Sequence, residues 1–156
     1  MNRFWLAAAA LLLTGCGVHP SGVIDAGDAP TGVAPGVTLY FVNAHNELEP
    51  DLRSTERLGS ISEAMSLLLT GPGNSDLHTE IASNAPRQVV VTTTPEVIRL
   101  TVPLAIREVT PRGIDQIVCT ALGVHVQSGG SRNTKVQVRF TLTTPESDKL
   151  RTCPVW

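Results

Sequence analysis

The chain has 156 residues and a formal net charge of -2, with 12 lysines and arginines against 14 aspartates and glutamates. No run of like charges occurs, so the sequence lacks the electrostatic pattern of a nucleic-acid-binding protein or of a polybasic membrane contact. Its length suits one domain with linkers. We therefore expect no nucleic-acid partner.

The N-terminus has the organisation of a bacterial lipoprotein signal peptide. A positive start at Arg3 precedes an apolar segment over residues 5–13, and Leu-Thr-Gly leads directly into Cys16. This apolar segment is far shorter than the roughly 18 to 20 residues of a transmembrane helix, so we expect residues 1–15 to be cleaved off. The motif resembles a lipobox, which implies acylation of Cys16 and an extracytoplasmic protein attached to the membrane by lipid. The alternative is an ordinary leader in which Cys16 has no role.

The composition divides the remaining chain into three parts. Residues 16–36 are rich in glycine, proline, alanine and serine without an apolar period, which is typical of a flexible tether. Residues 37–145 carry the periodic patterns of one folded domain. Residues 146–156 form a C-terminal tail.

Two further cysteines, Cys119 and Cys153, form an even pair in a protein expected outside the cytoplasm. Such a pair is typical of a structural disulfide, which would fix the C-terminal tail to a helix. The alternative is a redox or metal pair, but the spacing fits neither a Cys-x-x-Cys motif nor a zinc site.

The first half of the domain predicts a strand, a loop and a helix. Residues 37–42 alternate as in a strand, whereas residues 43–59 hold most of the local charge and are interpreted as an exposed loop. Ser60 and Glu63 have capping-box spacing at the start of a helix that ends near Gly71. Its apolar positions predict one buried stripe: Ile61, Ala64, Met65, Leu68 and Leu69.

The next part predicts a hairpin and a second helix. Residues 88–94 and 97–102 are β-rich and only two residues apart, which is typical of an antiparallel hairpin. Thr110 and Pro111 predict the start of a helix, and Gly123 is interpreted as its end. The apolar stripe of this helix is Ile114, Ile117, Val118, Ala121 and Leu122.

The last strand is predicted over residues 135–142, with residues 124–127 interpreted as a short strand beside it. The expected inward side chains are Val136, Val138, Phe140 and Leu142. The order strand, helix, strand, strand, helix, strand contains two helices that each need one apolar face covered by a sheet. We therefore predict an α+β fold, a two-layer sandwich with a mostly antiparallel sheet.

No catalytic or metal-binding pattern is recognisable in the sequence. Signatures of serine or cysteine nucleophiles and phosphate-binding glycine loops are absent. We expect a non-enzymatic protein with no catalytic residue, no metal and no cofactor. The four histidines lack paired ligand spacing: His19, His45, His78 and His125.

Two arrangements of acidic residues stay open as alternatives. Glu47 and Asp51 would support catalysis if a cleft raised the pKa values of both carboxyls. Asp76, His78 and Glu80 alternate and would converge on one face of a strand, although solvent exposure is the simpler interpretation.

Several short segments together resemble a known family. Residues 38–42 read Thr-Leu-Tyr-Phe-Val, residues 48–53 supply Leu, Pro and Arg, residues 64–72 end in Leu-Leu-x-Gly-Pro, and residues 77–81 contain Leu, Thr and Ile at alternate positions. In this order, the segment from Val37 to Leu142 resembles the GerMN domain of GerM-type spore-germination and sporulation lipoproteins. Asp76 and Ala82 depart from the glycine and proline of that pattern.

The resemblance implies an extracytoplasmic, non-enzymatic module of envelope or spore-related assemblies, with a fold related to ring-building domains. It provides no catalytic residues, and a single domain gives no reason to infer a role in sporulation. We expect a membrane-tethered module that binds an envelope protein through an exposed sheet edge or the charged residues 43–59. The alternative is a lipoprotein that binds a small ligand or a cell-wall fragment, which requires a concave pocket.

Overall fold

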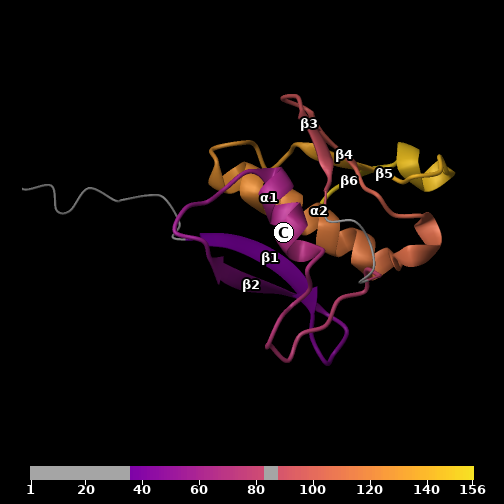
Figure 1. The fold of residues 1–156 in the computed structure, drawn as a ribbon. Coiled ribbons are helices and arrows are strands. Elements are labelled where there is room, and N and C mark those ends of the chain that lie inside the picture. Colours follow the sequence, from indigo (N-terminus) through magenta and orange to yellow (C-terminus); the bar gives the residue numbers. More distant parts are fainter. Residues whose placement is uncertain (1–35, 83–87) are drawn as a thin grey trace, which may run out of the picture. The chain divides into compact units, whose positions relative to one another are not determined.

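The computed structural model describes residues 36–82 and 88–156, which belong to one compact unit, Gly32–Trp156. The predicted leader, Cys16 and the tether before Gly36 lie outside the described residues. Figure 1 shows the elements in order: β1 (Gly36–Val42), β2 (Leu48–Ser54), α1 (Ile61–Leu68), β3 (Val90–Thr93), β4 (Val97–Thr101), the 3-10 turn η1 (Ile106–Glu108), α2 (Pro111–Gln127), β5 (Lys135–Arg139), the 3-10 turn η2 (Pro145–Asp148) and β6 (Leu150–Arg151).

The strands form two sheets around the helices. β1 and β2 make an antiparallel pair, and a second sheet has the order β3-β4-β5-β6. In that sheet β4 and β5 run parallel, joined through α2, while both outer pairings are antiparallel. Both helices contact β1, and α2 also contacts β5. The predicted α+β fold is confirmed, and the helices covering the sheets agree with a two-layer arrangement.

The predicted capping box opens α1. The Ser60 hydroxyl accepts a hydrogen bond from the Glu63 N–H at 3.3 Å, and the Glu63 carboxylate accepts one from the Ser60 N–H at 2.6 Å. Two N–H groups at the helix start are satisfied in this way. The buried side chains of α1, Ala64, Met65 and Leu68, belong to the predicted stripe.

α2 is the central element, and it is longer than the sequence predicts. The Thr110 hydroxyl accepts a hydrogen bond from the Gly113 N–H at 3.1 Å, which confirms the predicted start. The predicted end at Gly123 is wrong, as is the predicted strand over residues 124–127, because the helix continues to Gln127. Glycine inside a helix costs only about 1 kcal/mol, and burial of Val124, which is 1% exposed, outweighs that cost.

Two polar side chains of α2 complete the free edge of β1. Gln116 and Thr120 are both fully buried. The Thr120 hydroxyl accepts from the Tyr40 N–H at 3.0 Å, and the Gln116 amide donates to the Tyr40 C=O at 3.0 Å. Buried backbone groups are costly when unpaired, so α2 serves β1 as a neighbouring strand would.

The interpretation of residues 43–59 as a loop is wrong, because Leu48–Ser54 is β2. The charged side chains suggested an exposed loop, and only one residue of the strand, Leu48, is buried. Arg53 lies beside β1 with its guanidinium 5.8 Å from the centre of the Phe41 ring, and it pairs with Asp51 at 2.7 Å. Because only one side chain of β2 is buried, the strand carries no alternating apolar pattern.

The predicted hairpin of β3 and β4 is confirmed, with Thr93 opposite Ile98. The last strand is shorter than predicted, because β5 ends at Arg139. Leu142, expected to point inward, is 64% exposed. The chain leaves the sheet after Phe140, whose N–H donates to the Ser147 hydroxyl of η2 at 3.4 Å. The tail then returns to pair with β5 as β6.

Candidate interaction site

Three strands form the open sheet edges of the described residues, and two of these edges are protected. β2 carries Pro50 opposite Tyr40, where the N–H that proline lacks would point outward. Proline and charged side chains on an edge strand oppose pairing with another chain. β6 is only two residues long, and Cys153 follows it in a disulfide.

The third edge, β3, is not protected by proline or charge, and only its start meets α1, where the Ser62 hydroxyl donates to the Val89 C=O at 3.0 Å. Residues 88–94 contain no charged residue, no proline and no glycine, and Val90 is 63% exposed. The Thr94 N–H donates to the Val97 C=O at 2.9 Å, so Thr94 and Val97 are a hydrogen-bonded pair. Along an antiparallel ladder, hydrogen-bonded pairs alternate with pairs whose backbone groups point away from each other. The backbone groups of Val91 and Thr93 therefore point away from β4, and they form no hydrogen bond with any residue that the structure describes.

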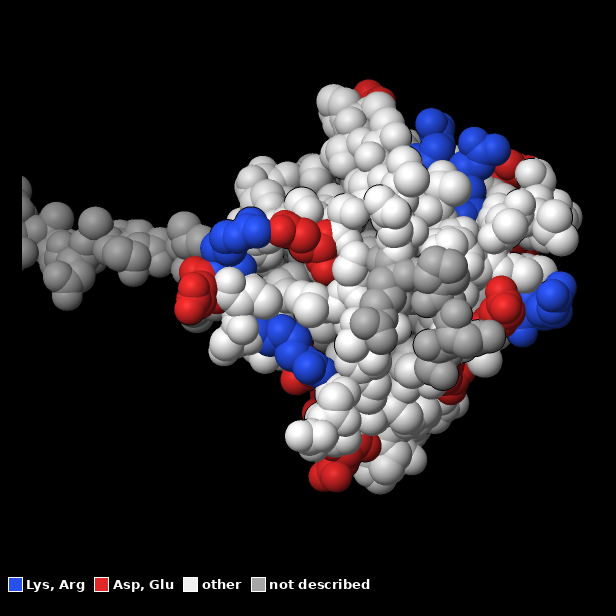
Figure 2. Space-filling view, in the orientation of Figure 1, with Lys and Arg blue, Asp and Glu red and all other residues white. Residues whose placement is uncertain are grey.

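The side chains on the open face of the second sheet are basic. Arg99 on β4 lies opposite Gln137 on β5, with Lys135 and Arg139 two positions to either side of Gln137. All three cations are exposed, and none forms an ion pair within residues 36–82 and 88–156. Figure 2 shows lysine and arginine side chains gathered where β4, β5 and β6 lie, at the upper right. We call Arg99, Lys135 and Arg139 the basic face.

The charged residues 43–59 are largely engaged within the domain. Asp51 pairs with Arg53, which also donates to the Pro72 C=O. Arg57 pairs with Glu63 at 2.6 Å. These contacts leave little of the segment's charge for a partner, so this candidate is weaker than the edge of β3.

Comparison with protein families, curated proteins and solved structures finds no match. The function must therefore be inferred from the chemistry of this chain's own surfaces. The resemblance to the GerMN domain stays a prediction.

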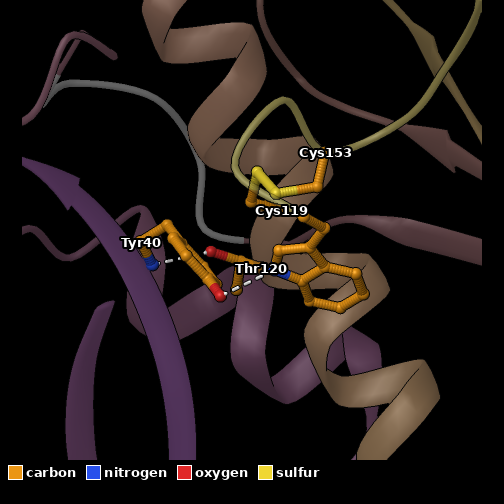
Figure 3. The surroundings of a disulfide bond; sticks show 5 residues. Tyr40, Cys119, Thr120 and Cys153 are labelled. Carbon is orange, nitrogen blue, oxygen red and sulfur yellow. Dashed lines mark hydrogen bonds between the residues drawn. A yellow bond between two sulfur atoms is a disulfide. The ribbon is translucent and has the colours of Figure 1, made fainter. Parts of the chain in front are cut away.

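The predicted disulfide joins Cys119 of α2 to Cys153 of the tail, with the Cα atoms 4.7 Å apart. Figure 3 shows it one residue from Thr120, whose side chain faces Tyr40 on β1. The tail continues to Trp156, whose indole N–H donates to the Tyr40 hydroxyl at 3.0 Å. The tail is therefore fixed to α2 and β1 together.

The structure does not bring the candidate catalytic acids together in one site within the described residues. Asp51 pairs with Arg53, whereas Glu47 accepts a weak hydrogen bond from Asn43 in the hairpin turn. His78 and Glu80 do approach each other, with Nε2 and Oε1 4.0 Å apart, and Asp76 is exposed. The described residues contain no cluster of three or more histidine, cysteine or acidic side chains able to hold a metal ion. His19 lies outside them.

One acidic residue at the start of α2 has a perturbed environment. Burial raises the pKa of Asp115 above its ordinary value, and Arg112 and Arg151 partly oppose that shift. Asp115 lines a hollow of about 340 Å³ beside Glu80 and Thr110. The Thr110 hydroxyl donates to Glu80, so this second carboxylate already has a partner. Sequence reasoning missed Asp115, because its burial depends on how α2 packs.

A mainly apolar hollow lies between α1 and the segment after β2. Its volume is about 360 Å³, and its apolar lining comes from Val37, Leu58, Ala64 and Leu67. It opens to solvent, whereas pockets for small ligands bury most of the ligand surface. This geometry favours a binding surface over a ligand-enclosing pocket.

The predicted lipid anchor, Cys16, lies outside the described residues. Within residues 36–82 and 88–156, neither helix is long and apolar enough to cross a membrane.

Proposed function

We propose that this protein is an extracytoplasmic lipoprotein, anchored through Cys16, whose domain binds a segment of another envelope protein by strand addition at β3. The observation that carries the proposal is the uncharged, unprotected edge of β3. The module has no enzymatic role in this proposal, with no catalytic residue and no cofactor. We also propose, from the resemblance alone, that the domain is of the GerMN type.

Strand addition requires outward backbone donors and acceptors in one row. Val91 and Thr93 supply these groups on β3, and their side chains do not block the edge because both project from one face of the sheet, perpendicular to its plane. In this mode of recognition, backbone hydrogen bonds provide affinity and alternate side chains provide specificity. The exposed side chain of Val90 offers an apolar contact to the added strand.

The predicted anchor and tether suit such a module. A flexible coil of residues 16–36 would hold the domain about 25 Å from the lipid on average, at about 5 to 6 Å times the square root of its length. Confinement near the membrane raises the effective concentration of a membrane-bound partner. A short edge of modest intrinsic affinity then suffices for binding.

The test is a pair of matched proline variants. Thr93→Pro removes an outward N–H from β3 and leaves the β3–β4 hydrogen bonds in place, because Thr93 and Ile98 form a non-hydrogen-bonded pair. Leu52→Pro makes the same change on β2, where Leu52 is opposite Thr38. Both variants should fold, as checked by circular dichroism.

Tagged, lipidated protein would be captured from chemically cross-linked cells and its partners identified by mass spectrometry. We expect an envelope protein that is retained by Leu52→Pro and lost with Thr93→Pro. Equal loss in both variants, or no specific partner for the unmodified protein, would contradict strand addition at β3. Cys16→Ala should move the protein out of the membrane fraction, and its recovery there would contradict the anchor.

A further inference from the structure

We propose that the basic face is a second membrane contact, which docks the domain on an anionic phospholipid surface. The inference rests on the proposed function in one respect, since the lipid anchor at Cys16 would bring the domain to the membrane. The occupant is a lipid surface with negatively charged phosphate headgroups.

Cations without an ion-pair partner are concentrated on one sheet face. Elsewhere in the described residues, most basic side chains are engaged: Arg53, Arg57, Lys149 and Arg151 in ion pairs, and Arg132 against the Trp156 ring. On the basic face, Arg99 donates only to the Gln137 amide oxygen, at 2.9 Å, and no acidic residue lies among the facing positions of β4 and β5. Like charges on neighbouring strands repel one another, and an anionic surface would relieve that repulsion.

Exposed apolar side chains border this face. Val90 on β3 and Leu150 on β6 share it, because Val90 is paired with Thr101 and Leu150 with Gln137. They are 63% and 57% exposed, and Leu142, which follows β5, is 64% exposed. Cations bordered by exposed aliphatic side chains are suited to a headgroup layer, where the cations meet phosphates and the aliphatic groups enter the acyl boundary. A soluble polyanion would use the cations alone.

The basic face and the β3 edge point in different directions. The side chains of the basic face project perpendicular to the sheet plane, whereas the backbone groups of the β3 edge point outward within that plane. Both surfaces can therefore be occupied together. η2, which contacts β5, carries the acidic residues Glu146 and Asp148, and Glu146 pairs with Lys149 and Arg151 rather than with the basic face.

The size of the effect follows from the charges. A lysine or arginine near an anionic bilayer contributes about fivefold to partitioning, so three contribute roughly a hundredfold. A contribution of this size would bind a free protein only weakly to a membrane. It is sufficient to orient a domain that acyl chains already hold at the membrane. The contact should weaken as salt screens it.

The test uses residues 32–156, which carry the whole described core, and vesicles of phosphatidylcholine with or without phosphatidylglycerol. Co-sedimentation should show binding that requires phosphatidylglycerol and falls between about 0.05 M and about 0.5 M salt. Lys135→Gln with Arg139→Gln should reduce partitioning by roughly 25-fold. The matched control is Arg107→Gln with Arg112→Gln, which removes the same charge from cations outside this face and should change partitioning by less than about twofold.

Equal losses in the two double variants would overturn the proposal, because net charge alone would then explain the binding. No preference for phosphatidylglycerol would also overturn it. Leu150→Asn should weaken vesicle binding, whereas tighter binding of soluble polyphosphate than of vesicles would identify a polymer site instead. These outcomes are separate from the Cys16→Ala fractionation and from the capture by β3, because residues 32–156 lack the anchor.

Discussion

The hydroxyl of Thr120 on α2 accepts a hydrogen bond of 3.0 Å from the backbone N–H of Tyr40, a residue 80 positions earlier in the chain. Thr120→Val keeps the shape and leaves this buried N–H unpaired, which should lower the free energy of unfolding by about 1 to 3 kcal/mol. Urea unfolding of residues 32–156 would measure the loss. Thr120→Ser keeps the hydroxyl and should lose less than valine. A serine variant as unstable as the valine variant would show that methyl packing, and not the hydrogen bond, dominates.

Two glycines of α2 should respond in opposite directions to alanine. A Cβ on Gly113 would lie 2.4 Å from the Glu80 carbonyl oxygen, so Gly113→Ala should cost about 1 to 3 kcal/mol. A Cβ on Gly123 would meet Tyr40 at an ordinary 3.7 Å, and Gly123→Ala should gain up to about 1 kcal/mol from helix propensity. Thermal unfolding of the two variants would test this. A stabilising Gly113→Ala would contradict the close approach of α2 to Glu80.

Loss of the disulfide should free the tail. The bond joins residues 34 positions apart, and the chain-entropy model gives about 3 to 4 kcal/mol for a loop of that length. Cys119→Ala with Cys153→Ala should lower the unfolding midpoint accordingly. Trp156 is the only tryptophan after the leader, so its fluorescence should report release from Tyr40. An unchanged midpoint with unchanged emission would show that the tail is held without the disulfide.

The burial of Asp115 predicts a pH dependence of stability. Because burial raises its pKa above 3.8 in the folded protein, the folded state holds the proton more tightly than the unfolded chain. This contribution is fully present below pH 3.8 and is lost as the pH rises through the folded pKa. Asp115→Asn should therefore be more stable than the unmodified protein at neutral pH, and the difference should vanish at acidic pH.

Urea unfolding across this pH range would follow the difference between the two proteins. Asp148→Asn, at an exposed carboxyl, controls for the loss of one negative charge. A constant difference at every pH would contradict the titration of Asp115 as its cause.

Local signals predicted much of the fold. The capping box of Ser60 and Glu63 located α1, Thr110 located the start of α2, and the two-residue gap after Thr94 located the hairpin. Features that depend on distant packing were missed or misjudged. β2 has no apolar period because β1 supplies most of that layer's buried side chains, and α2 continues past Gly123 because Val124 is buried beyond it.

The sequence predicted the kind of interaction site, an exposed sheet edge, but not its position in the fold. An exposed sheet edge followed from the strand content, but the sequence missed β2 and did not indicate which strand edge is open. That distinction needs the strand order and the direction of the Val91 and Thr93 backbone groups. The basic face depends on the parallel register of β4 and β5, which pairs Arg99 with Gln137 across 38 positions and has no local signature.

The completion of β1 by α2 has a consequence for folding kinetics. β1 is made early in synthesis, yet the side chains that satisfy the Tyr40 backbone belong to Gln116 and Thr120, which follow it by 76 and 80 positions. Contacts between such distant residues form slowly, because a long loop must close first. Until α2 has been synthesised and has packed against β1, one edge of the β1–β2 hairpin is uncovered. During this interval the nascent domain is most exposed to misassembly with other chains.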